Sequence, residues 1–423
     1  MLEYEVVVVG GGLSGVAAAV KAARDGAKTL LIERGGSLGG AATNMLVYPF
    51  MKCYIDKGGV REYIAKGIFS EIRKTAESLE GINYAERDTA DPFFSPEYLK
   101  LALDKLALDS GVSVLFHSVL TGVKRVDRKI EEITVQSGAQ SLTVKGNFFI
   151  DATGDGDLLA LAGCGFTLGR NSDGLCQPMT TCFRVCGVDI EQFMRDYDGL
   201  QNLYKQKRAA GEIKNPRENI LAFLHIGDGV VHFNTTRVVG LNPVDVFDRT
   251  KAEFIAREQV LEIMNFLKTN STAFKKATLI SVAPEIGVRE SRKLNGEYVL
   301  TAEDLKSYRQ FDDAVAYGSY MIDIHSPTGT GTEYFEFDPA KFYSIPYRCL
   351  LPKELDNLLV AGRCLSADQA AHSAVRIMPT CACMGEAAGV AAALAVKNNL
   401  KNREVDMKTL RAELKKGGAF ISD

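Results

Sequence analysis

The chain of 423 residues has no tryptophan, only five histidines and no excess of charge of either sign, since it carries 50 lysines and arginines and 53 aspartates and glutamates. A formal net charge of -3 indicates no basic surface for a nucleic acid or an anionic membrane, so neither partner is expected. The longest apolar run, residues 387–396, is too short to span a bilayer. No basic stretch followed by an apolar one opens the sequence, which favours a cytoplasmic protein.

The cysteines also lack familiar patterns. There are nine of them, an odd number, and they form neither a disulfide framework nor any Cys-x-x-Cys pair. This distribution favours reduced thiols and argues against a dithiol redox centre. Cys176, Cys182 and Cys186 are not accompanied by a histidine, so we expect no metal site.

What the sequence does contain is a nucleotide-binding pattern in residues 4–40. Residues 6–9 are four consecutive valines, which predict a buried strand, and the strand runs into a Gly-x-Gly-x-x-Gly motif that opens a helix. A second strand follows and ends on Glu33. The three glycines, in order, permit a tight turn, let the backbone approach a pyrophosphate and let the helix pack closely, and the acid suits a ribose hydroxyl.

Beyond Glu33 the chain resembles the FAD-dependent oxidoreductases whose flavin domain is shared with glutathione reductase, fumarate reductase and succinate dehydrogenase. The resemblance begins at Arg34 to Gly40 and recurs at 151–157 and 357–394. It implies FAD as the cofactor. Some fumarate reductase relatives attach FAD through a histidine near the glycine pair, but residues 37–50 contain none, so we expect non-covalent FAD. The residues expected to hold it are Gly10, Gly12, Leu13, Ser14, Gly15, Glu33, Arg34, Gly39, Gly40, Val119, Leu120, Ala152, Gly154, Asp155, Gly362, Arg363, Met378, Pro379 and Thr380.

The patterns and the resemblance together predict an α/β fold. A Rossmann-like FAD-binding domain, with a parallel sheet and a small antiparallel meander, would accept an inserted α+β substrate domain. The FAD-binding domain is expected at 1–48, 95–164 and 346–400, an excursion at 49–94, the substrate or cap domain at 165–345 and a tail at 401–423. Helices are expected at 60–79, 243–268 and 380–397, and the active site at the interface between the domains.

Four side chains are candidates for the reaction. Arg289 and Arg292 stand three apart, which predicts one helical face or one turn, and their segment resembles the Arg-Glu-x-Arg element of uncharacterised FAD-dependent family members. His325 precedes a flexible loop, and Arg376 lies in a segment that the resemblance places around the flavin ring. Arginine binds carboxylates bidentately and histidine titrates near neutrality. The three arginines also have structural explanations: Arg289 and Arg292 could pair with Glu290, Glu297 or Asp304, and Arg376 could bind a backbone carbonyl.

The sequence therefore predicts an FAD-dependent oxidoreductase that moves a hydride between FAD and a small organic substrate, anionic if the arginines bind it. No second Gly-x-Gly-x-x-Gly in a strand-helix context follows the first, so no NAD(P)H domain is expected and the electron donor or acceptor is open. Two alternatives stay open as well: a flavin-dependent transferase or isomerase, and a non-catalytic FAD-binding protein. The sequence decides neither the substrate nor the oligomeric state.

Overall fold

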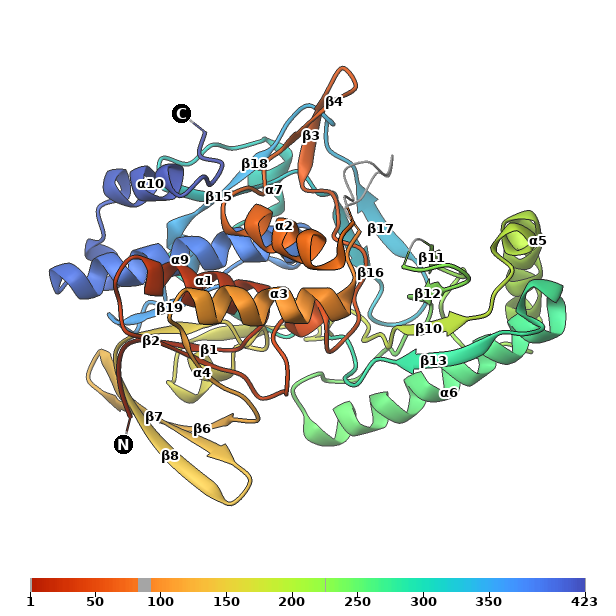
Figure 1. The fold of residues 1–423 in the computed structure, drawn as a ribbon, viewed down its shortest axis with the longest axis horizontal. Coiled ribbons are helices and arrows are strands. Elements are labelled where there is room, and N and C mark those ends of the chain that lie inside the picture. Colours follow the sequence, from red (N-terminus) through yellow and green to blue (C-terminus); the bar gives the residue numbers. More distant parts are fainter. Residues whose placement is uncertain (1, 83–92, 225, 423) are drawn as a thin grey trace.

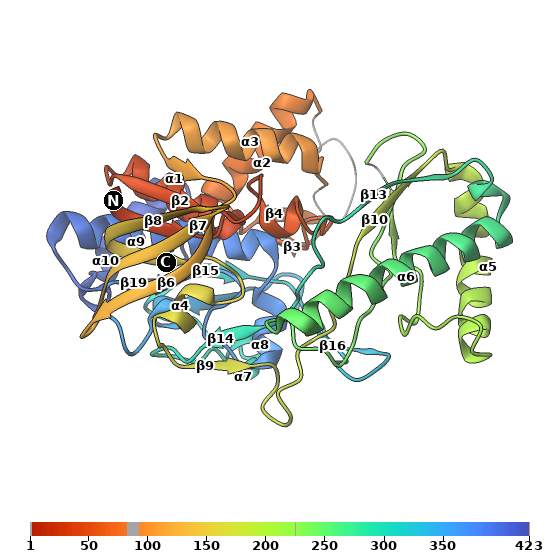
Figure 2. The ribbon, with the colours of Figure 1, turned by 90° about the horizontal axis from the view of Figure 1, so that it is seen from below.

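The computed structural model describes residues 2–82, 93–224 and 226–422, and within them a large body carries a smaller sheet at one end (Figure 1 and Figure 2). The large body is built on a seven-stranded sheet in the order β5-β2-β1-β8-β7-β6, with β19 also paired to β8. Its strands are β1 (Leu2–Val9), β2 (Thr29–Ile32), β5 (Ser113–Leu115), β6 (Val119–Val126), β7 (Lys129–Ser137), β8 (Gln140–Asp151) and β19 (Leu358–Val360). The pairs among β5, β2, β1, β8 and β19 are parallel, and β6, β7 and β8 form an antiparallel meander. The predicted fold class is confirmed.

The alternation of side chains along β1 decides what covers each face of this sheet. Val6 and Val8 belong to a core shared with α1 (Leu13–Arg24), α2 (Ile68–Glu80), α3 (Pro96–Asp109) and α9 (Met378–Asn398). Val7 and Val9 belong to a second core, which they share with the meander and with α4 (Asp157–Leu161). All four valines are buried on a strand covered on both faces, as the sequence predicted.

Helix α9 packs closely against α1 at two positions where it has glycine and therefore no side chain. A Cβ atom on Gly385 would lie 2.0 Å from the carbonyl oxygen of Ser14, and one on Gly389 would lie 2.2 Å from that of Ala18. Among the described residues α9 is the one helix long and apolar enough to cross a membrane, but 83% of its 18-residue apolar window is buried inside the structure. It is therefore a core helix here, enclosed by the sheet and its neighbouring helices.

The smaller sheet, called the cap sheet below, is antiparallel in the order β11-β12-β10-β13. Its strands are β11 (Ala222–Phe223), β12 (Val231–Phe233), β10 (Phe183–Cys186) and β13 (Thr278–Val282), with α5 (Ile190–Ala209) and α6 (Val246–Asn270) beside it. Phe183, Val185, Val231 and Phe233 share a core with both helices. The long helix predicted at 243–268 is thus confirmed as α6.

Only part of the segment 165–345 belongs to this cap. Leu305, Val315 and Tyr343 join the large core, so α7 (Ala302–Lys306), β15 (Ala314–Gly318) and β18 (Tyr343–Pro346) belong to the main body. Two ribbons, β9 (Phe166–Leu168) with β14 (Arg292–Leu294) and β16 (Ile322–His325) with β17 (Thr332–Phe335), complete the segment. The short helices α8 (Gln369–Val375) and α10 (Met407–Lys416) flank α9 in the sequence.

The helix predicted to begin near residue 60 is wrong at its start. β3 (Tyr54–Lys57) and β4 (Val60–Tyr63) form a hairpin, and α2 begins only at Ile68. The hairpin turn is made by Gly58 and Gly59, whose φ angles of 67° and 89° lie in the left-handed region. The glycine pair therefore turns the chain back on itself before the helical pattern can start.

We expect Gly385→Ala to destabilise the protein by ~2 kcal/mol or more, because the added methyl forces α9 away from α1. Gly199→Ala is the matched control, since Gly199 lies within α5 and a Cβ there meets nothing within 4 Å. That variant should gain ~0.5–1 kcal/mol from helix propensity. Urea denaturation measures both, and equal effects of the two changes would contradict the close packing of α1 and α9.

Candidate functional site

Three turns meet at one edge of the parallel sheet. Val9 of β1 lies opposite Asp151 of β8, and Asp151 lies opposite Val360 of β19. Because these parallel strands end in register, the turns that follow them, 10–12, 152–156 and 361–363, come together at the carboxyl edge. Open α/β sheets bind ligands at this edge.

The glycines of the first turn serve two different purposes. Gly10 has a φ of 103°, and a Cβ there would lie 2.4 Å from the carbonyl oxygen of Ala152. A Cβ on Gly15 would lie 1.7 Å from the carbonyl oxygen of Gly10, whereas one on Gly12 would meet nothing within 4 Å. Gly10 and Gly15 are therefore required by the protein's own packing, whereas Gly12 faces open space at the start of α1.

Glu33 holds the first turn in place. Its side chain is 6% exposed, and its carboxylate accepts hydrogen bonds from the amides of Gly11 at 2.6 Å and Gly35 at 2.7 Å. A carboxylate offers about four lone-pair sites, so these two bonds leave capacity for hydroxyl donors of a ribose. The acid at the end of β2 thus supports the turn and still lines the space beside it.

Two buried aspartates shape the second turn. Asp151 accepts from the amides of Thr153 and Leu159, and burial raises its pKa to about 6. Asp155 accepts from Nη2 of Arg363 at 2.7 Å. Burial acts to raise the pKa of Asp155, but Arg363 and Arg249 outweigh it and lower that pKa to about 2. Arg363 is therefore committed to an ion pair that ties the third turn to the second.

The start of α9 adds a partial positive charge. Ile377 precedes the helix without a side-chain cap, and the first turn contains no acidic residue. The free amides of that turn therefore keep the positive end of the helix dipole unneutralised. Met378, the first residue of α9, lines the same space as Gly12 and Glu33.

A cleft of about 490 Å³ joins this edge to the cap sheet. It is lined from the cap side by Thr180, Cys182, Phe223 and Asn234. Most of the residues predicted to hold the cofactor line it: Gly10, Gly12, Leu13, Ser14, Glu33, Arg34, Gly39, Gly40, Ala152, Gly154, Gly362, Arg363 and Met378. The open space at Gly12, the acid after β2 and the free helix ends form a cradle that fits a dinucleotide.

The other predicted cofactor residues lie outside the lining. Four of them belong to the turns and helix starts but do not face the cleft: Gly15, Asp155, Pro379 and Thr380. Val119 and Leu120, expected near an adenine, begin β6 and are not brought to the cleft. The backbone of Ser118 instead bonds to Glu33, so contact with the acidic turn is made just before β6 starts.

Arg289 lies at the cap end of the cleft. One of its nitrogens, Nη1, donates to the carbonyl oxygen of Pro178 at 2.7 Å and to the hydroxyl of Thr180. Burial lowers the pKa of Arg289 to about 9, and nearby arginines, first Arg376 and then Arg217, add to that effect. All three guanidinium groups line the cleft, so this end is short of negative charge.

His325 also lines the cleft, but both of its ring nitrogens have partners. Nδ1 faces Nη2 of Arg237 at 3.0 Å, and Nε2 lies 3.5 Å from Oδ2 of Asp323. Because arginine can only donate, Nδ1 accepts and the proton of the neutral ring sits on Nε2. Burial, with help from Arg289, lowers the pKa of His325 to about 3, so the ring is neutral at physiological pH.

The sequence reasoning missed Asp323, Tyr320 and Arg217, which all line the cleft. Asp323 precedes His325 by two residues on one strand, so their shared face was a signal available in the sequence. The hydroxyl of Tyr320 lies 3.2 Å from Oδ2 of Asp323. Arg217, 5% exposed, stands in no recognisable motif, and only the tertiary fold brings it here.

Arg376 lines the cleft and Arg292 does not. Arg376 donates weakly to Gln177 at 3.3 Å, and its Nε has no partner among the described residues. Arg292 instead donates to a carboxylate oxygen of Asp157 at 2.9 Å, outside the cleft. The expected common helical face is wrong, because residues 289–291 form no helix and Arg292 begins the strand β14.

The alternative in which Glu290 pairs with either arginine is also wrong. Oε1 of Glu290 lies 2.5 Å from Nζ of Lys293, and both side chains are almost fully buried. Oε2 of Glu290 accepts from the backbone amide of Gln177 at 3.0 Å and from the side chain of Gln369 at 2.8 Å. Its oxygens are thus occupied, and Arg289 keeps no carboxylate partner from its own segment.

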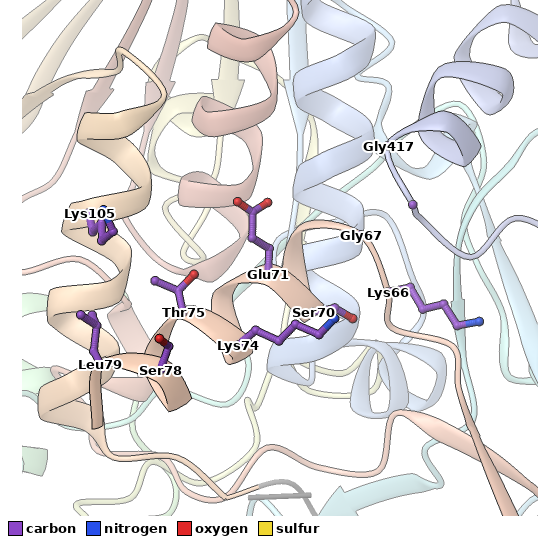
Figure 3. Close-up of a pocket in the computed structure, with 11 residues that line it drawn as sticks. Lys66, Gly67, Ser70, Glu71, Lys74, Thr75, Ser78, Leu79, Lys105 and Gly417 are labelled. Atoms are coloured by element: carbon purple, nitrogen blue, oxygen red, sulfur yellow. The ribbon is translucent and has the colours of Figure 1, made fainter. Parts of the chain in front are cut away.

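A second hollow, of about 650 Å³, lies between α2, α3 and residues 417–418 (Figure 3). It shares no lining residue with the cleft and contains none of the turns that follow the parallel strands. Its acid, Glu71, already binds Arg24 through both oxygens, at 2.7 and 2.8 Å. We therefore place the functional site in the cleft.

Comparison with known proteins gives a family match over almost the whole chain. The family model described as FAD dependent oxidoreductase matches residues 5–414. A thiamine thiazole synthase of Methanococcus vannielii is 30% identical over 162 residues, which cover 36% of this chain and 57% of the relative. A leghemoglobin reductase of Glycine max is 32% identical over 165 residues, covering 38% of this chain and 29% of the relative. The chain thus spans little more than half the length of the first of these relatives and less of the second.

Among solved structures, a geranylgeranyl bacteriochlorophyll reductase-like protein from Thermoplasma acidophilum aligns with a TM-score of 0.49 and 14% identity, covering 99% of this chain and 85% of that one. A flavin-dependent brominase, Bmp2, aligns with a TM-score of 0.47 and 13% identity, covering 98% and 83%.

The glycines of the first turn give a direct test of the cradle. We expect Gly12→Ala to leave the stability of the cofactor-free protein within ~0.5 kcal/mol, because its Cβ enters open space, but to weaken FAD binding by about tenfold or more. Gly15→Ala should instead prevent stable folding, since its Cβ collides with backbone. Thermal melting of the cofactor-free variants and quenching of FAD fluorescence on titration measure the two effects. A Gly12→Ala variant that binds FAD normally would place the pyrophosphate elsewhere.

Proposed function

The chain belongs to the family of FAD-dependent oxidoreductases, and from that premise we propose that it transfers a hydride between FAD and a small anionic organic substrate bound in the cleft. It is an FAD-dependent enzyme, and FAD is its cofactor. We also propose that FAD is bound non-covalently. The observation that supports an anionic substrate is the excess of positive charge at the cap end of the cleft.

The cofactor end of the cleft is assigned to the residues that form the cradle. The amides at the start of α1 and Gly12 would take the pyrophosphate, Glu33 a ribose, and the start of α9 with Gly362 the flavin ring. Bound FAD supplies the two-electron redox chemistry. What the protein adds is position, because each of these groups is fixed by backbone turns rather than by flexible side chains.

The substrate end is assigned to the cluster of Arg217, Arg289 and Arg376. Three guanidinium groups line this end together with the carboxylate of Asp323. Glu285 also lines the cleft, but its carboxylate is paired with Arg34 and Arg249. Arginine binds carboxylates through two parallel hydrogen bonds, and buried like charges become favourable when an anion joins them. An anionic substrate would therefore be held between this cluster and the cradle.

We assign a positioning role to His325. Its Nε2 proton points to Asp323 and its Nδ1 accepts from Arg237, so neither nitrogen is free to exchange a proton with a substrate. The arrangement holds the Asp323 carboxylate at the edge of the arginine cluster. The sequence makes His325 a candidate for the reaction itself, and we propose that it acts instead through Asp323.

The main alternative is a group-transfer or synthase reaction on the same fold. Several relatives are named thiamine thiazole synthase, although the matched part covers only 57% of their length. The two readings differ in one observable. A hydride-transferring enzyme exchanges electrons with its substrate and a synthase need not, so an anaerobic screen of small acids, alcohols and sugars for bleaching of the yellow flavin separates them.

We expect Arg289→Met to slow substrate-dependent bleaching by about a hundredfold, ~3 kcal/mol in the barrier, because a charged bidentate contact is lost. Arg195→Met is the control, since Arg195 is exposed on α5 and its side chain pairs with Glu191 and Gln192 of the same helix, and it should bleach at the normal rate. Stopped-flow absorbance under anaerobic conditions measures both rates. Equal rates in Arg289→Met and the unmodified enzyme would remove Arg289 from the proposed substrate site.

Non-covalent attachment has its own test. We expect acid precipitation to release all of the flavin into the supernatant, because the glycine turns line the cleft with backbone and residues 37–50 contain no histidine. The absorbance of the supernatant and of the redissolved pellet measures the partition. Flavin that stays with the pellet after washing would show a covalent link.

A further inference from the structure

The two faces of the cap sheet differ in character. Phe183 and Val185 on β10, with Val231 and Phe233 on β12, point to α5 and α6. Side chains alternate along a strand, so the residues that alternate with these four point the other way, towards the main body. These are Cys182, Arg184, His232 and Asn234, and the first and last of them line the cleft.

Arg184 is buried without enough partners. Its side chain is 8% exposed, and neither Nε nor Nη2 makes a hydrogen bond within the described part of the chain. Burial lowers its pKa, as expected of a cation held away from water. Glu97 attracts this charge, but no carboxylate in the described residues is hydrogen-bonded to Nε or Nη2. A buried cation without a hydrogen-bonded counter-ion costs several kcal/mol, and a bound anion would offset that cost.

His232 stands beside Arg184 in the same condition. The two residues are direct cross-strand partners, and His232 is fully buried with no hydrogen bond to either ring nitrogen in the described residues. Burial, reinforced by Arg184, lowers its pKa to about 3, so the ring is neutral. It lies against aromatic rings, 5.3 Å from that of Tyr48 and 6.2 Å from that of Phe223.

Neither residue of this pair is part of the lining of the substrate cleft, but both adjoin residues that are. Phe223 is the cross-strand partner of His232 on its other side, and it lines the cleft. Arg184 is two residues beyond Cys182 on the same face, a step of about 7 Å along a strand. Thr180, which receives a hydrogen bond from Arg289, is four residues from Arg184, or about 13 Å along extended chain.

We propose that Arg184 and His232 form a second subsite, which binds a carboxylate at the far end of an elongated substrate. The inference rests on the proposed function, because it takes the near end of that substrate to be the anion held by Arg289. Nε and Nη2 lie on one edge of the guanidinium, the edge that meets a carboxylate through two parallel bonds. The neutral His232 ring adds one further N–H donor, and Phe223 offers an apolar surface to the connecting chain.

The test is a binding series with linear α,ω-dicarboxylates of about four to fourteen carbons, and monocarboxylates of equal length, on the FAD-loaded enzyme. Titration calorimetry and perturbation of the flavin spectrum give the Kd values. We expect affinity to rise once the chain spans about 13 Å and the long dicarboxylates to bind about tenfold tighter than the matched monocarboxylates. Equal affinities of long dicarboxylates and monocarboxylates would overturn the proposal.

Variants identify the subsite. Arg184→Met should abolish the advantage of the long dicarboxylates, leave short acids within about twofold, and leave the melting temperature equal or higher, because it removes an unpaired buried charge. Arg184→Lys keeps the positive charge but loses the two parallel N–H donors of the guanidinium, so the variant should lose most of the tighter binding of long dicarboxylates. Arg257→Met is the control, since Arg257 is half exposed and paired with Glu253. A lowered melting temperature with an unchanged length profile would show a structural cation and end the proposal.

The two proposals fail separately. Arg289→Met should weaken the binding of short and long acids alike. If it affects neither while Arg184→Met removes the dicarboxylate advantage, the assignment of Arg289 falls and the second subsite stands. If Arg289→Met acts as expected and Arg184→Met has no effect, the second subsite falls alone.

Discussion

The common register of β1, β8 and β19 is the constraint on which the site depends. Val9, Asp151 and Val360 end level with one another, so three turns reach the same edge and the backbone atoms of Gly10 and Ala152 come into contact. A slip of one residue in β19 would turn its side chains to the opposite face and carry Gly362 away from Ser14. Glu33 and Asp151 then lock two of the turns through bonds to backbone amides. The cofactor end is thus specified by strand pairing and needs no cationic side chain.

The substrate end is built on a different principle. Its groups are side chains from separate segments, with Arg217 and Arg289 from the cap half of the chain and Arg376 from the entry to α9. Their charges exceed that of Asp323, and the fold holds this imbalance because α5, α6 and α9 stabilise the surrounding cores. In proteins generally, strain and unpaired charge are found mainly at functional sites, where the surrounding fold is stable enough to hold them.

How much could be predicted from the sequence follows this division. The cradle could be predicted from the sequence, because its signals are local: a valine strand, glycines at fixed spacing, an acid after β2 and a proline at the start of α9. The arginine cluster and its neighbour Asp323 could be predicted only in part. Residues 217, 289, 323 and 376 are far apart in the sequence and meet only through tertiary packing. The spacing of Arg289 and Arg292 predicts a shared helical face or turn, but Arg292 begins β14 and binds Asp157 outside the cleft. Val119 and Leu120, expected near an adenine from the resemblance alone, are not among the residues that line the cleft.

Helix α9 connects the two ends. Its glycines let it lie against α1, and its start faces the cradle, while Arg376 of the cationic cluster lies two residues before it. A bound anion would relieve repulsion among Arg376, Arg289 and Arg217 and would stabilise the folded protein, since ligands that bind only the folded state stabilise it. The amide dipoles at the start of α9 would favour negative charge on the flavin side. Under the proposed function, substrate charge and cofactor placement would thus meet at the start of one helix.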